Sequence, residues 1–109
     1  MAFDEGVAQR LRETLDFMES YVEKKMFGGL CFLIHGNMAC GLINDEVIVR
    51  VGPENYEQYL QEEHTRVFDF TGRVMKGWVV VIPEGHESDQ DLSRWVRAGV
   101  DYALTLPPK

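Results

Sequence analysis

Apolar residues recur every three or four positions along the first part of the chain. Charged residues agree with a helix there, because Asp4 and Glu5 favour its positive N-terminal end and Lys24 and Lys25 its negative C-terminal end. The spacing predicts one amphipathic helix over residues 3–25. Its apolar stripe comprises Phe3, Val7, Leu11, Leu15, Met18 and Val22, with Phe17 and Tyr21 widening it.

Three short apolar runs follow the double glycine Gly28-Gly29. They span residues 30–34, 38–43 and 47–51, and Gly, Asn and Asp residues separate them. Such residues form the tight turns that join neighbouring strands. The pattern therefore predicts an antiparallel meander of three strands.

The register of the first hairpin decides where the cysteines lie. A turn at His35-Gly36 would place Cys31 opposite Cys40, whereas a turn at Gly36-Asn37 would pair Cys40 with Leu33. Both cysteines stand in apolar surroundings without the paired spacing of zinc or redox sites. We expect buried thiols that act as small hydrophobic residues.

The second half of the chain continues with alternating helical and strand patterns. Pro53 suits the start of a short helix, and the patterns of residues 66–70 and 77–82 predict two strands. Ser88 is a candidate N-cap for the last helix, which ends before Pro107-Pro108. The apolar residues expected to face the core are Tyr56, Tyr59 and Leu60 in the short helix, and Leu92, Trp95, Val96, Gly99, Val100 and Ala103 in the last one.

The predicted order of elements is α-β-β-β-α-β-β-α, in one domain that spans residues 1–109. Helices that cover one face of a five-stranded, mainly antiparallel sheet form a two-layer α+β domain. The sequence contains no internal repeat, low-complexity tract or linker, so we expect a single core.

Composition limits the classes of function. Apolar residues make up 45% of the 109 residues, but no apolar run is long enough to span a bilayer, and the acidic N-terminus is unlike an export signal. We therefore expect a cytoplasmic protein without membrane association. The net charge of -7 repels a phosphate backbone unless the few basic residues gather on one face.

Two motifs point to a known family. Lys25-Met26-Phe27-Gly28-Gly29 precedes the first predicted strand, and residues 72–78, Gly-Arg-Val-Met-Lys-Gly-Trp, precede the last one. Together with the order of elements, they make the chain similar to the N-terminal domain of the TfoX/Sxy proteins. The resemblance implies this fold and a regulatory role, because two-domain members are bacterial competence regulators that act on transcription with the cyclic-AMP receptor protein. Those members add a C-terminal helical domain, which this chain is expected to lack, and the family offers no catalytic residues to transfer.

Five basic residues are candidates for a binding surface. We expect Arg50, Arg73 and Lys76, together with Lys24 or Lys25, to converge at one edge of the sheet and form a local basic site. Such a site would grip an anion or an acidic segment of a partner. The alternative is that these residues form ordinary ion pairs with the abundant carboxylates.

Apolar residues beside glycines are the second group of candidates. Met26-Phe27 and Met75, near Gly28-Gly29 and Gly72, would form an exposed apolar groove that adapts to a partner. The alternative is that they fill the core where a helix meets the sheet. Phe27→Asp separates the two cases, because it abolishes partner capture in a folded domain only if Phe27 belongs to an interface.

Catalytic, cofactor and metal signatures do not appear in the sequence. His35, His64 and His86 lack metal-ligand spacing, and Gly28-Gly29 lacks the pattern of a nucleotide-binding loop. The preferred interpretation is a non-enzymatic regulatory domain that binds a protein partner without a cofactor. Its interface would use either the apolar positions around Met26-Phe27 and Met75 or an exposed edge strand, with Arg73 and Lys76 at the rim. The same surface would also form a homodimer. Direct DNA binding in transcription is the alternative, and small-ligand binding in an enclosed pocket is a further one. The sheet face left uncovered by helices is the first place to look.

Overall fold

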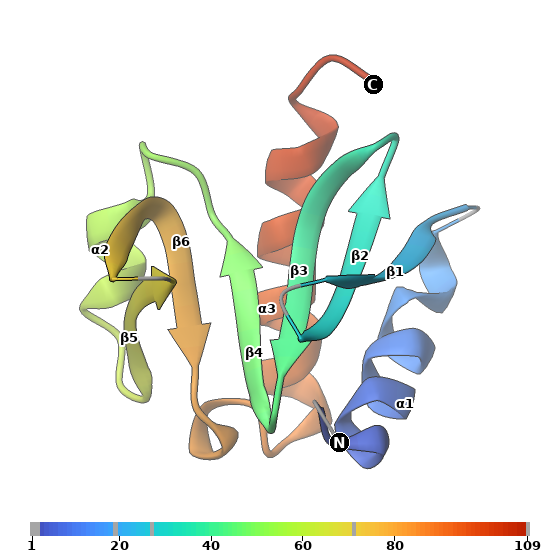
Figure 1. The fold of residues 1–109 in the computed structure, drawn as a ribbon, viewed down its shortest axis with the longest axis horizontal. Coiled ribbons are helices and arrows are strands. Elements are labelled where there is room, and N and C mark those ends of the chain that lie inside the picture. Colours follow the sequence, from blue (N-terminus) through green and yellow to red (C-terminus); the bar gives the residue numbers. More distant parts are fainter. Residues whose placement is uncertain (1–2, 19, 27, 71, 109) are drawn as a thin grey trace.

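Helices cover one face of an antiparallel sheet in this computed structural model, which describes residues 3–18, 20–26, 28–70 and 72–108 (Figure 1). In chain order the elements are α1 (Glu5–Thr14), the 3-10 helix η1 (Leu15–Phe17), β1 (Val22–Met26), β2 (Gly29–Ile34), β3 (Asn37–Ile43), β4 (Glu46–Arg50), α2 (Tyr56–Leu60), β5 (Thr65–Phe70), β6 (Arg73–Val81), the 3-10 helix η2 (Pro83–Gly85) and α3 (Asp89–Leu104).

The predicted two-layer α+β class is confirmed, but the predicted strand number is wrong. The described residues form a sheet of six strands in the order β1-β2-β3-β4-β6-β5, and every neighbouring pair is antiparallel. The element order is therefore α-β-β-β-β-α-β-β-α, with two 3-10 helices in addition.

The extra strand comes from the segment that the apolar spacing assigned to the first helix. Asp4 caps α1 by accepting from the backbone N–H groups of Gly6 and Val7, but the helix ends at Thr14 rather than Lys25. Residues 22–26 pair with β2 instead, in a regular register from Val22 opposite Leu33 to Met26 opposite Gly29. Pairing satisfies backbone groups of β2 that an extended helix would leave open, so the tertiary contact overrides the helical period.

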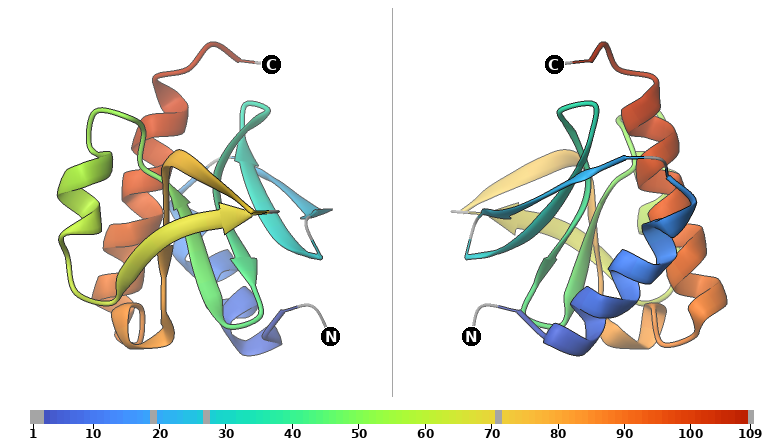
Figure 2. Two further views of the ribbon diagram at one scale, coloured as in Figure 1. Left: turned by 60° about the vertical axis from the view of Figure 1, so that its left-hand side comes forward. Right: turned by 90° about the vertical axis from the view of Figure 1, so that its right-hand side faces the viewer.

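The main core lies between the sheet and the helices α1, α2 and α3. Figure 2 shows these helices on the same side of the sheet, with α3 across its middle strands. Trp95 and the other apolar residues predicted for α3 are buried, and Tyr59 of α2 lies 5.3 Å from Trp95 between ring centroids. The buried residues of this core include Leu11, Leu15, Phe32, Leu42, Val47, Val49, Val79 and Leu92.

Neither predicted cysteine register is correct. The turn does form at His35-Gly36, where both residues have positive φ (52° and 84°), but the pairing shifts beyond Leu33. Cys40 therefore lies opposite Phe32, and Cys31 opposite Gly41. A bulge of this kind adds a residue to one strand and moves every later side chain to the other face. Both thiols are buried as expected, and the described residues offer neither of them a disulfide partner.

Candidate interaction surface

Two hairpins project from the sheet on the side away from α3. The turns of the β1–β2 and β5–β6 hairpins lie on this same side in both views of Figure 2. Gly28 and Gly72 adopt positive φ in these turns (72° and 78°), and no described atom lies within 4 Å of a Cβ added to either. A side chain is disfavoured at these positions by backbone conformation rather than by crowding. One glycine of each sequence motif, Gly28 and Gly72, therefore shapes an exposed hairpin tip.

The sheet face opposite the helices carries a second apolar cluster, which we call the outer face. Ile48, Phe68 and Val80 are buried there, while Ile43, Met75 and Trp78 pack against them and remain partly exposed. Met75 thus packs in this cluster and also reaches the surface. The outer face lies between the two hairpins, which extend from the middle strands on the side opposite α3 (Figure 2).

The two hairpins also carry exposed apolar side chains. Val22 and Met26 of β1 are 50% and 41% exposed, and Val74 of β6 is 52% exposed. Phe27 lies outside the described residues, so the prediction made for it stays a prediction.

The basic residues predicted from the sequence lie on three strands. Arg50 of β4 stands opposite Trp78 of β6. Arg73 and Lys76 also belong to β6, so these three basic residues come from neighbouring strands. Lys24 and Lys25 belong to β1, at the other edge of the sheet. The structure thus places the five residues on the two hairpins and on β4, one of the two strands between them, rather than along one edge.

Arg50 is held by aromatic rings. Its Cζ lies 5.1 Å from the centroid of the Trp78 ring and 5.4 Å from that of the Tyr102 ring. Cation–π attraction at these distances stabilises the guanidinium without neutralising its charge. Gly52 allows this approach, because a Cβ at its positive φ of 88° would lie 2.5 Å from the Tyr102 ring.

Ion pairing distinguishes these five basic residues from most of the others. Among the described residues, none of Lys24, Lys25, Arg50, Arg73 and Lys76 forms an ion pair. The arginines that do form one bind their carboxylates elsewhere: Arg10 with Asp89, Arg12 with Glu23, Arg66 with Glu46, and Arg94 with Glu62. The candidate basic residues thus keep their charge available on an acidic domain.

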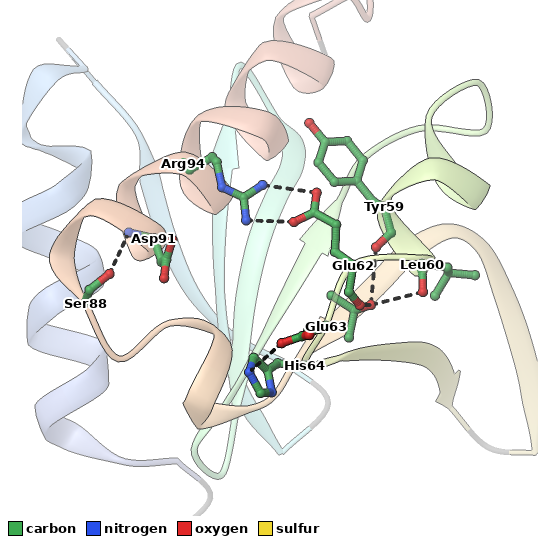
Figure 3. Close-up of polar contacts among 9 residues, drawn as sticks. Tyr59, Leu60, Glu62, Glu63, His64, Ser88, Asp91 and Arg94 are labelled. Atoms are coloured by element: carbon green, nitrogen blue, oxygen red, sulfur yellow. Dashed lines mark hydrogen bonds and ion pairs between the residues drawn. The ribbon is translucent and has the colours of Figure 1, made fainter.

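Figure 3 shows the contrast on the helical side. Arg94 of α3 donates to both oxygens of Glu62, at 2.8 and 3.2 Å, and ties α3 to the loop after α2. His64 in that loop lies 3.8 Å from the Glu63 carboxylate. The Thr65 hydroxyl lies within hydrogen-bond distance of the carbonyls of Tyr59, Leu60 and Glu62 and donates its one proton to the nearest of them, Glu62 at 2.7 Å. The polar side chains around Glu62 thus make internal contacts.

A pocket of about 430 Å³ lies where the loop after β4 meets α2 and α3. The residues that line it include two acidic ones, Glu54 and Asp101, and two tyrosines, Tyr59 and Tyr102. No sequence pattern indicates this pocket, because its walls come from two segments far apart in the chain. Its remaining walls are Val51, Gly52, Pro53, Asn55, Ala98 and Thr105.

The histidines and cysteines have local roles. His86 is buried, and its Nε2 donates to the Asp45 carbonyl over 2.9 Å, while His35 shapes a turn.

Burial raises the pKa of Cys31 to about 11 and that of Cys40 to about 12, which keeps both thiols protonated near neutral pH. Within the described part of the chain, no group of three or more His, Cys, Asp or Glu residues is arranged to hold a metal ion.

None of the helices that the structure describes has the length and apolar character needed to cross a membrane.

Comparison with curated proteins found no match, and comparison with solved structures found none. The family model of the TfoX N-terminal domain matches residues 13–103. This match includes both hairpin motifs, the outer face and most of α3. The chain therefore belongs to the TfoX N-terminal domain family.

Proposed function

We propose that this domain is a non-enzymatic protein-interaction domain with a regulatory role, which binds an acidic protein partner through the outer face and the two projecting hairpins. One observation carries the proposal: the basic side chains on β1, β4 and β6 form no ion pair within 4 Å among the described residues, although acidic residues outnumber basic ones by eighteen to eleven in the chain. The family relationship supports the regulatory role.

The chemistry of this surface suits a protein partner. Interfaces combine an apolar centre with a polar rim. The outer face offers Met75 and Trp78, and Arg73 and Lys76 are exposed on the same strand. Rim charges of one sign steer a partner of the opposite sign and exclude those of the same sign. We therefore expect an acidic segment that carries exposed apolar residues.

Affinity capture with matched variants tests this proposal. The tagged domain is incubated with lysate of its source cells, with and without nuclease, and the captured partner is then purified for binding measurements. Lys76→Glu should weaken its affinity about tenfold or more, since one rim cation becomes a repulsive anion. Arg97→Glu is the control. Arg97 lies on α3, away from the proposed surface, and makes no ion pair among the described residues. Its substitution changes the net charge by the same amount as Lys76→Glu. Equal affinities of Lys76→Glu and Arg97→Glu would refute the proposed surface.

Direct DNA binding is the second candidate, favoured by the same unpaired cations and opposed by the net charge of -7. Loss of the captured material on nuclease treatment, together with affinity for duplex DNA that falls steeply with salt, would support it. Absence of DNA binding at low salt would exclude it.

Small-ligand binding has its own support in the pocket beside Tyr59 and Tyr102. Asp101→Asn alters this pocket without touching the outer face. A small molecule that stabilises the natural domain but not Asp101→Asn would assign ligand binding to the pocket.

A further inference from the structure

Strand β1 is an exposed edge of the sheet. All five of its residues are exposed, and it pairs with β2 along its whole length without a bulge. No described strand pairs with its outer side. An edge of this kind presents a row of free backbone donors and acceptors to another strand.

The hairpin register identifies the residues whose backbone groups point outward. Met26 stands opposite Gly29 across a two-residue turn, so these two residues form the hydrogen-bonded closing pair. Hydrogen-bonded residues alternate along an antiparallel pair, so Met26, Lys24 and Val22 use their backbone groups toward β2. Glu23 and Lys25 therefore direct their backbone N–H and C=O groups away from the sheet.

We propose that β1 pairs antiparallel with β1 of a second copy of this chain about a two-fold axis at Lys24, which joins the two sheets into one. In this register Glu23 stands opposite Lys25 of the second copy, and the reverse pair forms on the other side of the axis. Two such hydrogen-bonded pairs supply about four new backbone hydrogen bonds.

The side chains of β1 are self-complementary in this register. On the face toward α1 each Glu23 meets a Lys25, and on the opposite face each Val22 meets a Met26. Opposite charges and apolar side chains that face each other across strands stabilise the pairing. Glu23 already accepts two hydrogen bonds from Arg12, at 2.8 and 2.9 Å, but a carboxylate has acceptor sites left for a further ammonium group.

The opposite edge of the sheet lacks these properties. The pairing of β5 with β6 shifts register between Val67 and Asp69, which distorts that edge. Such irregularities protect edge strands from pairing with other chains. Regular pairing and self-complementary charges thus occur together at β1.

Lys24 opposes the dimer, because it meets its own counterpart at the axis. Like charges that stand directly opposite are destabilising, so the dimer is a reversible one. Dimerisation through β1 is an interaction separate from the proposed binding of an acidic partner. Arg73 and Lys76 take no part in β1 pairing, and therefore Lys76→Glu leaves the dimer intact while it weakens partner binding.

Disulfide trapping tests the position of the axis. The two copies of residue 24 form a non-hydrogen-bonded pair, whose Cα atoms lie about 4.5 Å apart, within the range that a disulfide spans. Oxidised glutathione should convert Lys24→Cys to a covalent dimer, whereas Lys76→Cys, also exposed on a hairpin, stays monomeric. Cys31 and Cys40 do not interfere, since they are 1% and 0% exposed. Failure of folded Lys24→Cys to cross-link faster than Lys76→Cys would overturn the proposal.

Charge reversal at the axis gives a second test that needs no covalent bond. A mixture of the natural chain and Lys24→Glu should form a mixed dimer with a dissociation constant about fivefold lower than that of either homodimer, because the axial pair becomes attractive. Lys25→Glu should instead raise the dissociation constant of the homodimer about tenfold, since each Glu23 would then face a carboxylate. Sedimentation velocity measures both. A sedimentation coefficient that is independent of concentration and unchanged by mixing would refute β1 pairing.

Discussion

Helix α3 approaches strand β3 most closely at Gly99, and this contact makes a quantitative prediction. A Cβ added to Gly99 would overlap the carbonyl oxygen of Ala39 and lie 3.0 Å from its carbonyl carbon. A carbon and a carbonyl oxygen normally stay at least about 3.3 Å apart. Since the obstacle is backbone and no flexible side chain can yield, Gly99→Ala must push α3 away from β3.

The cost follows from the residues that surround this contact. Trp95, Val96 and Val100 of α3 are buried, and a gap of about 0.5–1 Å forfeits a quarter to a half of each dispersion contact they make. Over-packing of this kind costs about 3 kcal/mol, whereas alanine gains about 1 kcal/mol over glycine in a helix. The net loss of about 2 kcal/mol corresponds to a fall in Tm of about 10 °C.

Thermal unfolding monitored by circular dichroism measures this difference. Gly6→Ala is the matched control, because Gly6 lies in α1 and its added Cβ would meet only the Asp4 side chain, at 3.1 Å. We expect that control to keep the natural Tm within a few degrees. A Gly99→Ala variant as stable as the natural chain would refute the close packing of α3 on β3.

Further predictions concern titratable and buried polar groups. The raised pKa values of Cys31 and Cys40, about 11 and about 12, mean that the folded state holds these protons more tightly than the unfolded state. The contribution of the two thiols to the free energy of unfolding is therefore fully present below about pH 8.5 and is lost as pH rises. Urea unfolding should show a loss of about 3 kcal/mol at pH 10 relative to a variant with alanine at both positions. Equal pH profiles of the two proteins would contradict this. Hydrogen bonding from Arg12 lowers the pKa of Glu23. The pair therefore stabilises the fold at pH values above the ordinary pKa of glutamate, and this stabilisation is lost as the pH falls through the lowered pKa of Glu23. Both side chains are about one-third exposed, so Arg12→Ala should cost no more than about 1 kcal/mol at pH 7 and nothing at about pH 2, in the same assay. His86→Leu should cost about 2 kcal/mol in denaturant unfolding, because it leaves a main-chain carbonyl of the β3–β4 turn without its donor; an unchanged midpoint would exclude that role.

The fold was largely predictable where the pattern had one interpretation. Ser88 caps α3 as expected, accepting from the Asp91 N–H over 3.1 Å, and Figure 3 shows this contact. The same reasoning failed at β1, because Val22 and Met26 fit a helical period of four as well as the alternation of a strand. The bulge near Ala39 was also missed, since a register shift depends on the partner strand rather than on local composition.

The candidate surface was predictable in its residues but not in its arrangement. The alternation of β4 indicated that Arg50 leaves the core face, and the structure places it against Trp78 and Tyr102. No local pattern indicates that Lys24 and Arg73 would lie on two hairpins that project to one side. The pocket beside Asp101 lies between segments that meet only in the folded chain, so sequence spacing holds no signal for it.

Residue order alone determined the features that depend on neighbours along the chain: the caps of α1 and α3, the turns at His35 and Gly72, the two-layer class and the family. These features follow from backbone conformation and local hydrogen bonding, which act over a few residues. Tertiary structure decided which strand forms the edge, which face stays without helices and which cations lack a carboxylate. Those outcomes depend on contacts between distant segments, and the free energy of such contacts exceeds the weak local preference of residues 22–26 for a helix.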